Sequence, residues 1–188
     1  DARFLWVRRF RHPSTRAESL ARFYGGPVWE EFGPRANELM VDHTDVHLLV
    51  PDRSLSGFAT DHVPHEERSD GCGVPPGDDD RPCDGDSAVV AAVFDVARPR
   101  ELDAALVGSL SDAASTSGVT ELGRLVTASV TNDFPRLPVH EGPPVAVWLL
   151  SDRSGGRAAT ATAEAVATAH GLDLRTTVLT PTGRSTLR

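Results

Sequence analysis

The sequence contains only two cysteines and a single tyrosine among its 188 residues. It contains no lysine, so all 19 of its basic residues are arginine. The net charge of −8 excludes a broad electrostatic attraction to nucleic acid or anionic lipid, because both are polyanions. No uninterrupted apolar run approaches the roughly 20 residues of a membrane-spanning helix. The N-terminal apolar patch is too short and too rich in arginine for a signal-peptide core. We therefore expect a cytoplasmic protein with neither nucleic acid nor membrane as a partner.

The common chemical motifs are absent as well. The sequence has no G-x-G-x-x-G, Walker A, G-x-S-x-G or H-E-x-x-H pattern, which disfavours nucleotide-dependent and classical hydrolase chemistry. The spacings of His62 with His65 and of Cys72 with Cys83 match no compact zinc finger. Both cysteines lie in a polar stretch, so no disulfide framework supports the core. The sequence predicts no metal site and no cofactor.

Composition divides the chain into three parts. Residues 52–87 have few large apolar residues and many turn formers, and such a segment cannot bury enough surface to offset the entropy of ordering it. We interpret this segment as a flexible linker between an N-terminal part at residues 1–51 and a C-terminal domain at residues 88–188.

The C-terminal domain is expected to contain six elements in the order βαββαβ. The predicted elements are a strand at 88–97, a helix opened by Pro99, strands at 122–131 and 145–152, a helix at 156–170 ended by Gly171, and a strand at 173–181. This order is typical of the split βαβ, ferredoxin-like arrangement, in which two helices cover one face of a four-stranded antiparallel sheet.

The N-terminal part supplies only β, α, β. Strands are predicted at 4–10 and 45–51, and the amphipathic helix between them is interrupted by Gly25-Gly26-Pro27. The order matches the second half of the C-terminal repeat, with Trp6 and Trp148 in equivalent strands. Such a short βαβ unit has open sheet edges and needs partner strands. We expect these strands either to precede Asp1 in the natural gene product or to come from a second chain.

Three blocks carry a family resemblance. ARFLWVRRF, ARFYGGPVWEEFGPRANELMVD with DVHLLVP, and TNDFPRLPVHEGPPVAVWLL each resemble bacterial NIPSNAP proteins. The resemblance implies an α+β fold of tandem ferredoxin-like repeats, of the dimeric α/β-barrel type, with antiparallel sheets packed face to face and helices outside. The sheets would pair within a tandem chain or across a homodimer. It also implies that the first part of the N-terminal repeat is missing.

The resemblance says less about chemistry. The wider superfamily includes cofactor-free monooxygenases that act on aromatic polyketides, lactone isomerases and haem enzymes. Relatives often have His where this sequence has Phe32, and Arg where it has His140. These departures argue against transferring a catalytic role to either position.

Two residues are candidates for catalysis. His47 alternates with Val46 and Leu48 on a predicted strand and would be a general base near neutral pH if its face lines a cavity. A surface or interface histidine is the simpler interpretation. Tyr24 belongs to the best-matching block, and its hydroxyl would hydrogen-bond a substrate carbonyl, although aromatic residues at helical spacing more often form core.

Four further residues are candidates for ligand binding. Trp29 would line an apolar pocket beside Tyr24, and Asn37 would orient a ligand unless it only occupies the polar face of its helix. Arg8 would clamp a carboxylate or enolate, with an ion pair within the fold as the alternative. Trp6, in the same segment as Arg8, completes the predicted site.

Three functional hypotheses follow. The first is a protein that binds a small hydrophobic metabolite, in its enzymatic form a cofactor-independent oxygenase, isomerase or cyclase of secondary metabolism. The second is a non-catalytic binding or oligomerisation module, which a fully packed interior would favour. The third is a haem-binding barrel protein, for which His170 near a helix end is the only nearly suitable ligand.

Overall fold

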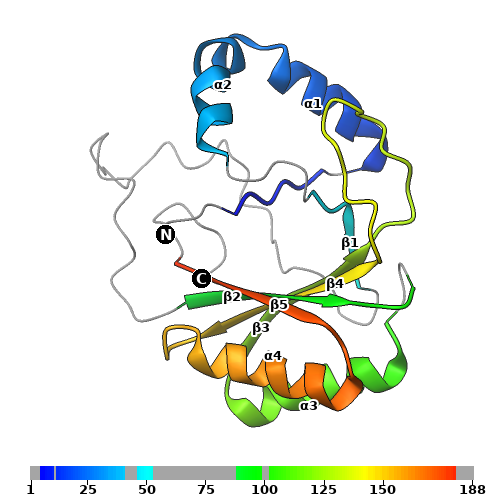
Figure 1. Cartoon of the computed structure of the whole chain (residues 1–188), viewed down its shortest axis with the longest axis vertical. Helices are drawn as coiled ribbons and strands as arrows, with labels where there is room; N and C mark the ends of the chain where they lie inside the picture. Colours follow the sequence, from blue (N-terminus) through cyan, green and yellow to red (C-terminus); the bar gives the residue numbers. More distant parts are fainter. Residues whose placement is uncertain (1–4, 11, 41–45, 53–87, 99–101, 181–188) are drawn as a thin grey trace, which may run out of the picture. The chain divides into compact units, whose positions relative to one another are not determined.

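The computed structural model describes residues 5–10, 12–40, 46–52, 88–98 and 102–180 (Figure 1). It separates into two compact units. The helical unit consists of residues 1–48 and 129–142, and the sheet unit consists of residues 49–128 and 143–188. Apart from Asp52, the predicted linker lies outside the described residues, as do His62, His65, Cys72 and Cys83.

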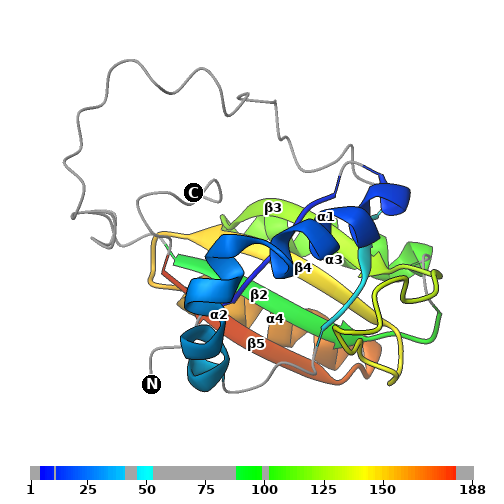
Figure 2. The same cartoon turned by 90° about the horizontal axis from the view of Figure 1, so that it is seen from above.

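The sheet unit contains one five-stranded, fully antiparallel sheet in the order β1-β3-β4-β2-β5. Figure 2 shows β3, β4, β2 and β5 side by side in this order, and Figure 1 shows both helices of the unit together on one face. The elements are β1 Leu49–Pro51, β2 Ala88–Asp95, α3 Ala104–Ser117, β3 Thr120–Thr127, β4 Val145–Asp152, α4 Arg157–His170 and β5 Leu174–Leu179. From residue 88 onward the chain therefore has the predicted order βαββαβ.

The core of the sheet unit lies between the sheet and these helices. Alternate residues of β2 and β4 point to the same face, and on the helical side they include Phe94, Trp148 and Leu150. Helix α3 contributes Leu106 and Leu110, which are spaced four residues apart and face this layer. Burying each large apolar side chain contributes roughly 1.5–3 kcal/mol to the stability of the fold.

The opposite face of the central strands is also apolar. Val89, Ala91, Val145 and Leu149 occupy the other positions of the alternation, and all four are buried. The sequence run at 88–97, apolar at successive positions, predicted this two-sided character correctly.

The helical unit contains η1 Pro13–Thr15, α1 Arg16–Tyr24 and α2 Pro27–Leu39. The predicted break is confirmed, because Gly25 ends α1, Gly26 precedes α2 and Pro27 occupies its first turn. The N–H that proline lacks has no intrahelical partner at that position, so Pro27 begins the helix at little cost.

Several predicted boundaries need correction. Helix α3 begins at Ala104, where the Asp103 side chain accepts a hydrogen bond from the Ala105 N–H at 2.7 Å, and Pro99 lies outside the described residues. Strand β3 runs over Thr120–Thr127 rather than 122–131. The end of α4 is as predicted, with Gly171 in the left-handed region at a φ of 62°.

The predicted strands of the N-terminal part differ most from the structure. Residues 5–10 form no strand, and the strand predicted at 45–51 is reduced to Leu49–Pro51. This short β1 pairs with β3, so it extends the sheet of the sheet unit rather than belonging to a repeat of its own. A strand depends on a hydrogen-bonded neighbour, and the described strands offer none to residues 5–10. The described residues thus form one sheet, and a second sheet packed against it stays a prediction.

Within the parts of the chain that the structure describes, no helix is both long and apolar enough to cross a membrane.

Candidate functional site

Four of the six residues predicted for the site come together in the helical unit. Trp6, Tyr24 and Trp29 surround Phe23, whose ring centroid lies 6.0, 5.1 and 5.3 Å from theirs. Tyr24 and Trp29 also meet edge to face at 4.7 Å. These edge and tilted geometries are the favoured ones for aromatic pairs. We call Trp6, Phe23, Tyr24, Trp29 and the stacked Phe134 the aromatic cluster.

The break between α1 and α2 assembles this cluster. Phe23 and Tyr24 are the last residues of α1, and Trp29 lies in the first turn of α2, so the short glycine linker brings the three rings together. Gly33 provides the space for the indole, because a Cβ at that position would lie 2.8 Å from Cε2 of Trp29. The local sequence therefore determines where the three rings meet and leaves space at Gly33 for the Trp29 indole.

Phe134 reaches the cluster from a distant part of the chain. Its ring stacks on Tyr24 with centroids 5.9 Å apart and an interplanar angle of 20°. Arg16, a buried residue of α1, holds this segment through a hydrogen bond to Oδ1 of Asn132 at 3.2 Å and an ion pair with Asp133. Asn132 also accepts a hydrogen bond from the Phe134 N–H at 3.1 Å, which holds the backbone of the turn that carries Phe134. The NDFPRLPV block thus completes the helical unit.

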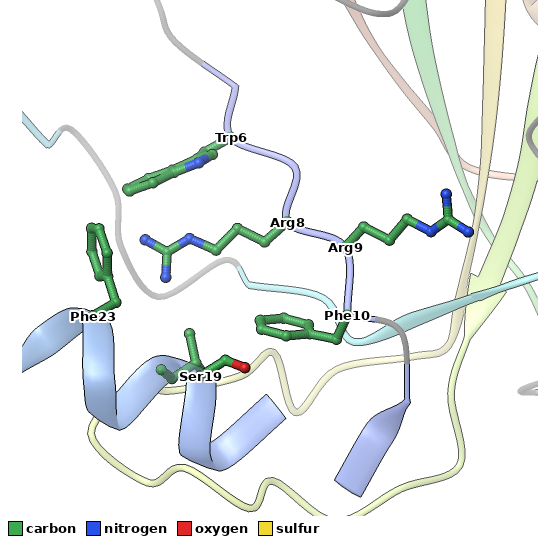
Figure 3. A pocket seen from close by; sticks show the side chains of 7 residues that line it. Trp6, Arg8, Arg9, Phe10, Ser19 and Phe23 are labelled. Atoms are coloured by element: carbon green, nitrogen blue, oxygen red, sulfur yellow. The ribbon is translucent and has the colours of Figure 1, made fainter. Parts of the chain in front are cut away.

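The guanidinium of Arg8 lies among these rings. Its central carbon is 3.8 Å from the ring centroid of Trp6, 4.8 Å from that of Phe23 and 5.2 Å from that of Tyr24. These distances are within the range of cation–π attraction. Figure 3 shows the tip of Arg8 between Trp6 and Phe23, whereas Arg9 points the opposite way. The Nη2 atom of Arg8 is buried and has no hydrogen-bond partner among the described residues.

A hollow of about 300 Å³ lies beside the cluster (Figure 3). Its walls combine aromatic and aliphatic side chains with three polar ones. The apolar side chains are Trp6, Phe10, Leu20 and Phe23, and the polar ones are Arg8, Arg9 and Ser19. Trp6 and Phe23 remain 52% and 37% exposed. The volume corresponds to the smallest class of ligand sites in proteins.

The other two predicted residues lie elsewhere. The half-buried His47 ring is 4.6 Å from that of His140, whose backbone N–H donates to the Val46 carbonyl at 2.8 Å. Asn37 is exposed near the end of α2, and its carbonyl accepts a hydrogen bond from the Met40 N–H at 3.3 Å. Among the described rings, His47 makes no aromatic contact with the cluster. The two predicted catalytic residues are therefore not brought into ring contact.

Reasoning from sequence missed Arg16, Phe23 and Phe134. Phe23 was detectable, because it precedes Tyr24 in the same block. Asn132 two residues before Phe134 is a pattern typical of an Asx-turn and would have indicated an ordered turn. The contact between Arg16 and this turn spans 116 residues of sequence and left no local signal.

The described residues include no group of three His, Cys, Asp or Glu side chains that could hold a metal ion. His170, the residue considered for haem, has its Nε2 2.8 Å from the Ser109 hydroxyl and so links α4 to α3. Flat aromatic surfaces beside a guanidinium can bind a planar apolar molecule and orient a polar group on it. Known protein families, curated proteins and solved structures were compared with the chain, and none gives a significant match. Its function is therefore inferred from the chemistry of this site.

Proposed function

We propose that this chain binds a small hydrophobic molecule against the aromatic cluster. One observation carries the proposal: the rings gather around Phe23, yet Trp6 and Phe23 keep 52% and 37% of their surface exposed beside a hollow. Large apolar groups clustered at a surface mark binding sites, because covering them removes apolar area from water. A planar ligand would complete the edge and stacked contacts that the rings already make with one another.

Tryptophan indole N–H resonances test the binding site directly. In ¹⁵N-labelled protein titrated with 2-naphthol, we expect the signals of Trp6 and Trp29 to move while that of Trp148, buried in the sheet unit, stays in place. Phe23→Leu removes the central ring and should weaken the effect. Phe32→Leu, which replaces an exposed ring on α2, is the matched control. Equal movement of all three indole signals, or none, would contradict the proposal.

For the fold, we propose a ferredoxin-like sheet unit in a NIPSNAP-like protein. The order β3-β4-β2-β5 with helices on one face supports it, since this is the arrangement of the split βαβ fold. The apolar residues on the other face, such as Val89 and Leu149, are what a sheet packed on a second sheet requires. The enzymatic form of the proposal is a cofactor-independent oxygenase, isomerase or cyclase, in which Tyr24, whose ring contacts Phe23, would hydrogen-bond a carbonyl of the ligand.

A second function, self-association, is favoured by a separate feature. Val28, Phe32 and Leu39 follow one another on α2 at intervals of four and seven residues, so they share one side of the helix. All three are more than half exposed, at 62%, 58% and 65%. We propose that this stripe packs against a second copy of the chain. Sedimentation equilibrium should show a dimer that Phe32→Ser dissociates and Glu31→Ser leaves intact.

A further inference from the structure

One nitrogen of the Arg8 guanidinium lacks a hydrogen-bond acceptor among the described residues. The guanidinium is stacked on Trp6, and this nitrogen, Nη2, is buried. A cation–π contact uses the flat face of a guanidinium and leaves its N–H groups directed outward in the plane. Leaving a buried charged donor without an acceptor costs free energy. An acceptor supplied from outside the chain would remove that cost.

The charge of the hollow points to the same acceptor. The chain as a whole carries −8, yet the described residues that line the hollow include no Asp or Glu, and the guanidinium of Arg8 lies between two of its aromatic rings. Ser19 adds a hydroxyl to the same wall. An anionic group would therefore meet a locally positive surface on an otherwise acidic protein.

We infer that the ligand is an aromatic carboxylic acid, with its flat body against Trp6 and Phe23 and its carboxylate on the edge of the Arg8 guanidinium. This inference rests on the proposed function, and it adds the chemical class of the ligand. The planar fork of arginine matches the two oxygens of a carboxylate and can donate to both at once. The aromatic walls exclude water from one side of the pair, which strengthens the charge-assisted hydrogen bonds.

Two probes of nearly equal shape, one charged and one neutral, distinguish the contribution of the carboxylate to affinity from that of the aromatic body. The labelled protein is titrated with 2-naphthoate and with neutral 2-naphthamide, and the Trp6 and Trp29 indole signals report each dissociation constant. We expect 2-naphthoate to bind about tenfold more tightly in the native chain, the difference a charged hydrogen bond supplies. Arg8→Met should abolish this preference and keep binding of 2-naphthamide. Arg8→Lys, which retains the charge without the planar fork, should keep only part of it.

Arg22→Met is the matched control, because Arg22 lies on α1 with its side chain 81% exposed and should leave the preference intact. Without ligand, the positions of the Trp29 and Trp148 signals verify that the helical unit and the sheet unit of each variant are folded. Equal affinity for both probes in the native chain overturns the carboxylate inference but leaves the proposed function standing. If neither probe moves the Trp6 and Trp29 signals, both fail. A preference that persists undiminished in Arg8→Met overturns the assignment to Arg8, and an undiminished preference in Arg8→Lys overturns it as well if Arg8→Met does not fold.

Discussion

The guanidinium of Arg16 donates a hydrogen bond to the side-chain carbonyl of Asn132, 3.2 Å away, and also pairs with Asp133. This contact joins α1 to the segment that carries Phe134. We expect Arg16→Met to lower the free energy of unfolding by about 2 kcal/mol, because it leaves acceptors without their charged donor. Urea denaturation followed by circular dichroism measures this change.

The matched control for Arg16 is Arg22→Met. Arg22 also lies on α1 and pairs with Glu18 at 3.0 Å, but both side chains are largely exposed. Exposed pairs contribute about 0–1 kcal/mol, so this variant should unfold almost like the native chain. Equal losses in the two variants would show that Arg16 does not anchor the segment.

Gly33 is expected to respond to alanine in the opposite way to an ordinary helical glycine. A Cβ there would meet the Trp29 ring at 2.8 Å, so Gly33→Ala should displace the indole from Tyr24 and destabilise the helical unit. At Gly108 in α3 a Cβ meets nothing within 4 Å, and alanine there should stabilise the protein by about 1 kcal/mol. Thermal unfolding and the Trp29 indole signal are the measurements. A Gly33→Ala variant as stable as Gly108→Ala, with that signal unmoved, would contradict the expected clash.

Local signals in the sequence predicted much of the fold. The break at Gly25-Gly26-Pro27, strand β4 at Val145–Asp152 and the end of α4 at Gly171 each depend on residues within one turn or one strand. The strand predicted at residues 4–10 depends instead on a partner strand. Its aromatic and branched residues favour an extended chain, but propensity alone does not supply the neighbour that a ladder requires.

The parts of the candidate site that depend on local sequence were also predictable, whereas the parts that depend on distant residues were not. Tyr24 and Trp29 lie on either side of the helix break, so their meeting follows from local sequence, and Trp6 and Arg8 were identified by residue type and their place in one segment. Phe134 was out of reach because its position depends on tertiary contacts with distant residues. His47 was selected by strand alternation, and its segment instead adjoins His140.

A buried ion pair on β3 should prove more sensitive than its exposed counterpart on α2. Arg124 donates to Glu121 at 2.7 Å and to the Ser111 hydroxyl of α3 at 3.1 Å, and its side chain is 2% exposed. A β-bulge between Glu121 and Gly123 places Glu121 on the same face as Arg124 despite their odd spacing. Arg124→Met should cost about 3 kcal/mol, since it leaves a largely buried carboxylate unpaired.

A double variant distinguishes the lost charge from lost packing at Arg124. Adding Glu121→Gln to Arg124→Met removes the unpaired carboxylate, so part of the stability should return. Arg35→Met, which breaks the exposed pair of Arg35 with Glu38, should change the free energy of unfolding by less than about 1 kcal/mol. If the double variant is as unstable as the sum of its single variants, the pair carries no coupling and the interpretation is wrong.

The ionised carboxylate of Asp152 should stabilise the fold near neutral pH, and this contribution to the free energy of unfolding should be lost in acid. Burial raises the pKa of its carboxyl, but hydrogen bonds from the N–H groups of Ala159, Gly156 and Ser154 and from the Ser154 hydroxyl outweigh this, and the pKa is lowered. A carboxylate whose pKa is lower in the folded state stabilises the fold above its unfolded pKa of about 3.9, and this stabilisation disappears as the pH falls through the folded value.

Asp152→Asn should therefore cost about 1–2 kcal/mol near neutral pH, because the start of α4 loses its charged acceptor. As the pH falls below the unfolded pKa of about 3.9 and then through the lowered folded pKa of Asp152, the native protein loses this stabilisation, so the difference between the two proteins should shrink. Urea denaturation at a series of pH values measures it, with the exposed Asp112→Asn of α3 as the matched control. A difference between Asp152→Asn and the native chain that stays constant down to pH 2 would mean that packing, rather than the charge of Asp152, holds the start of this helix.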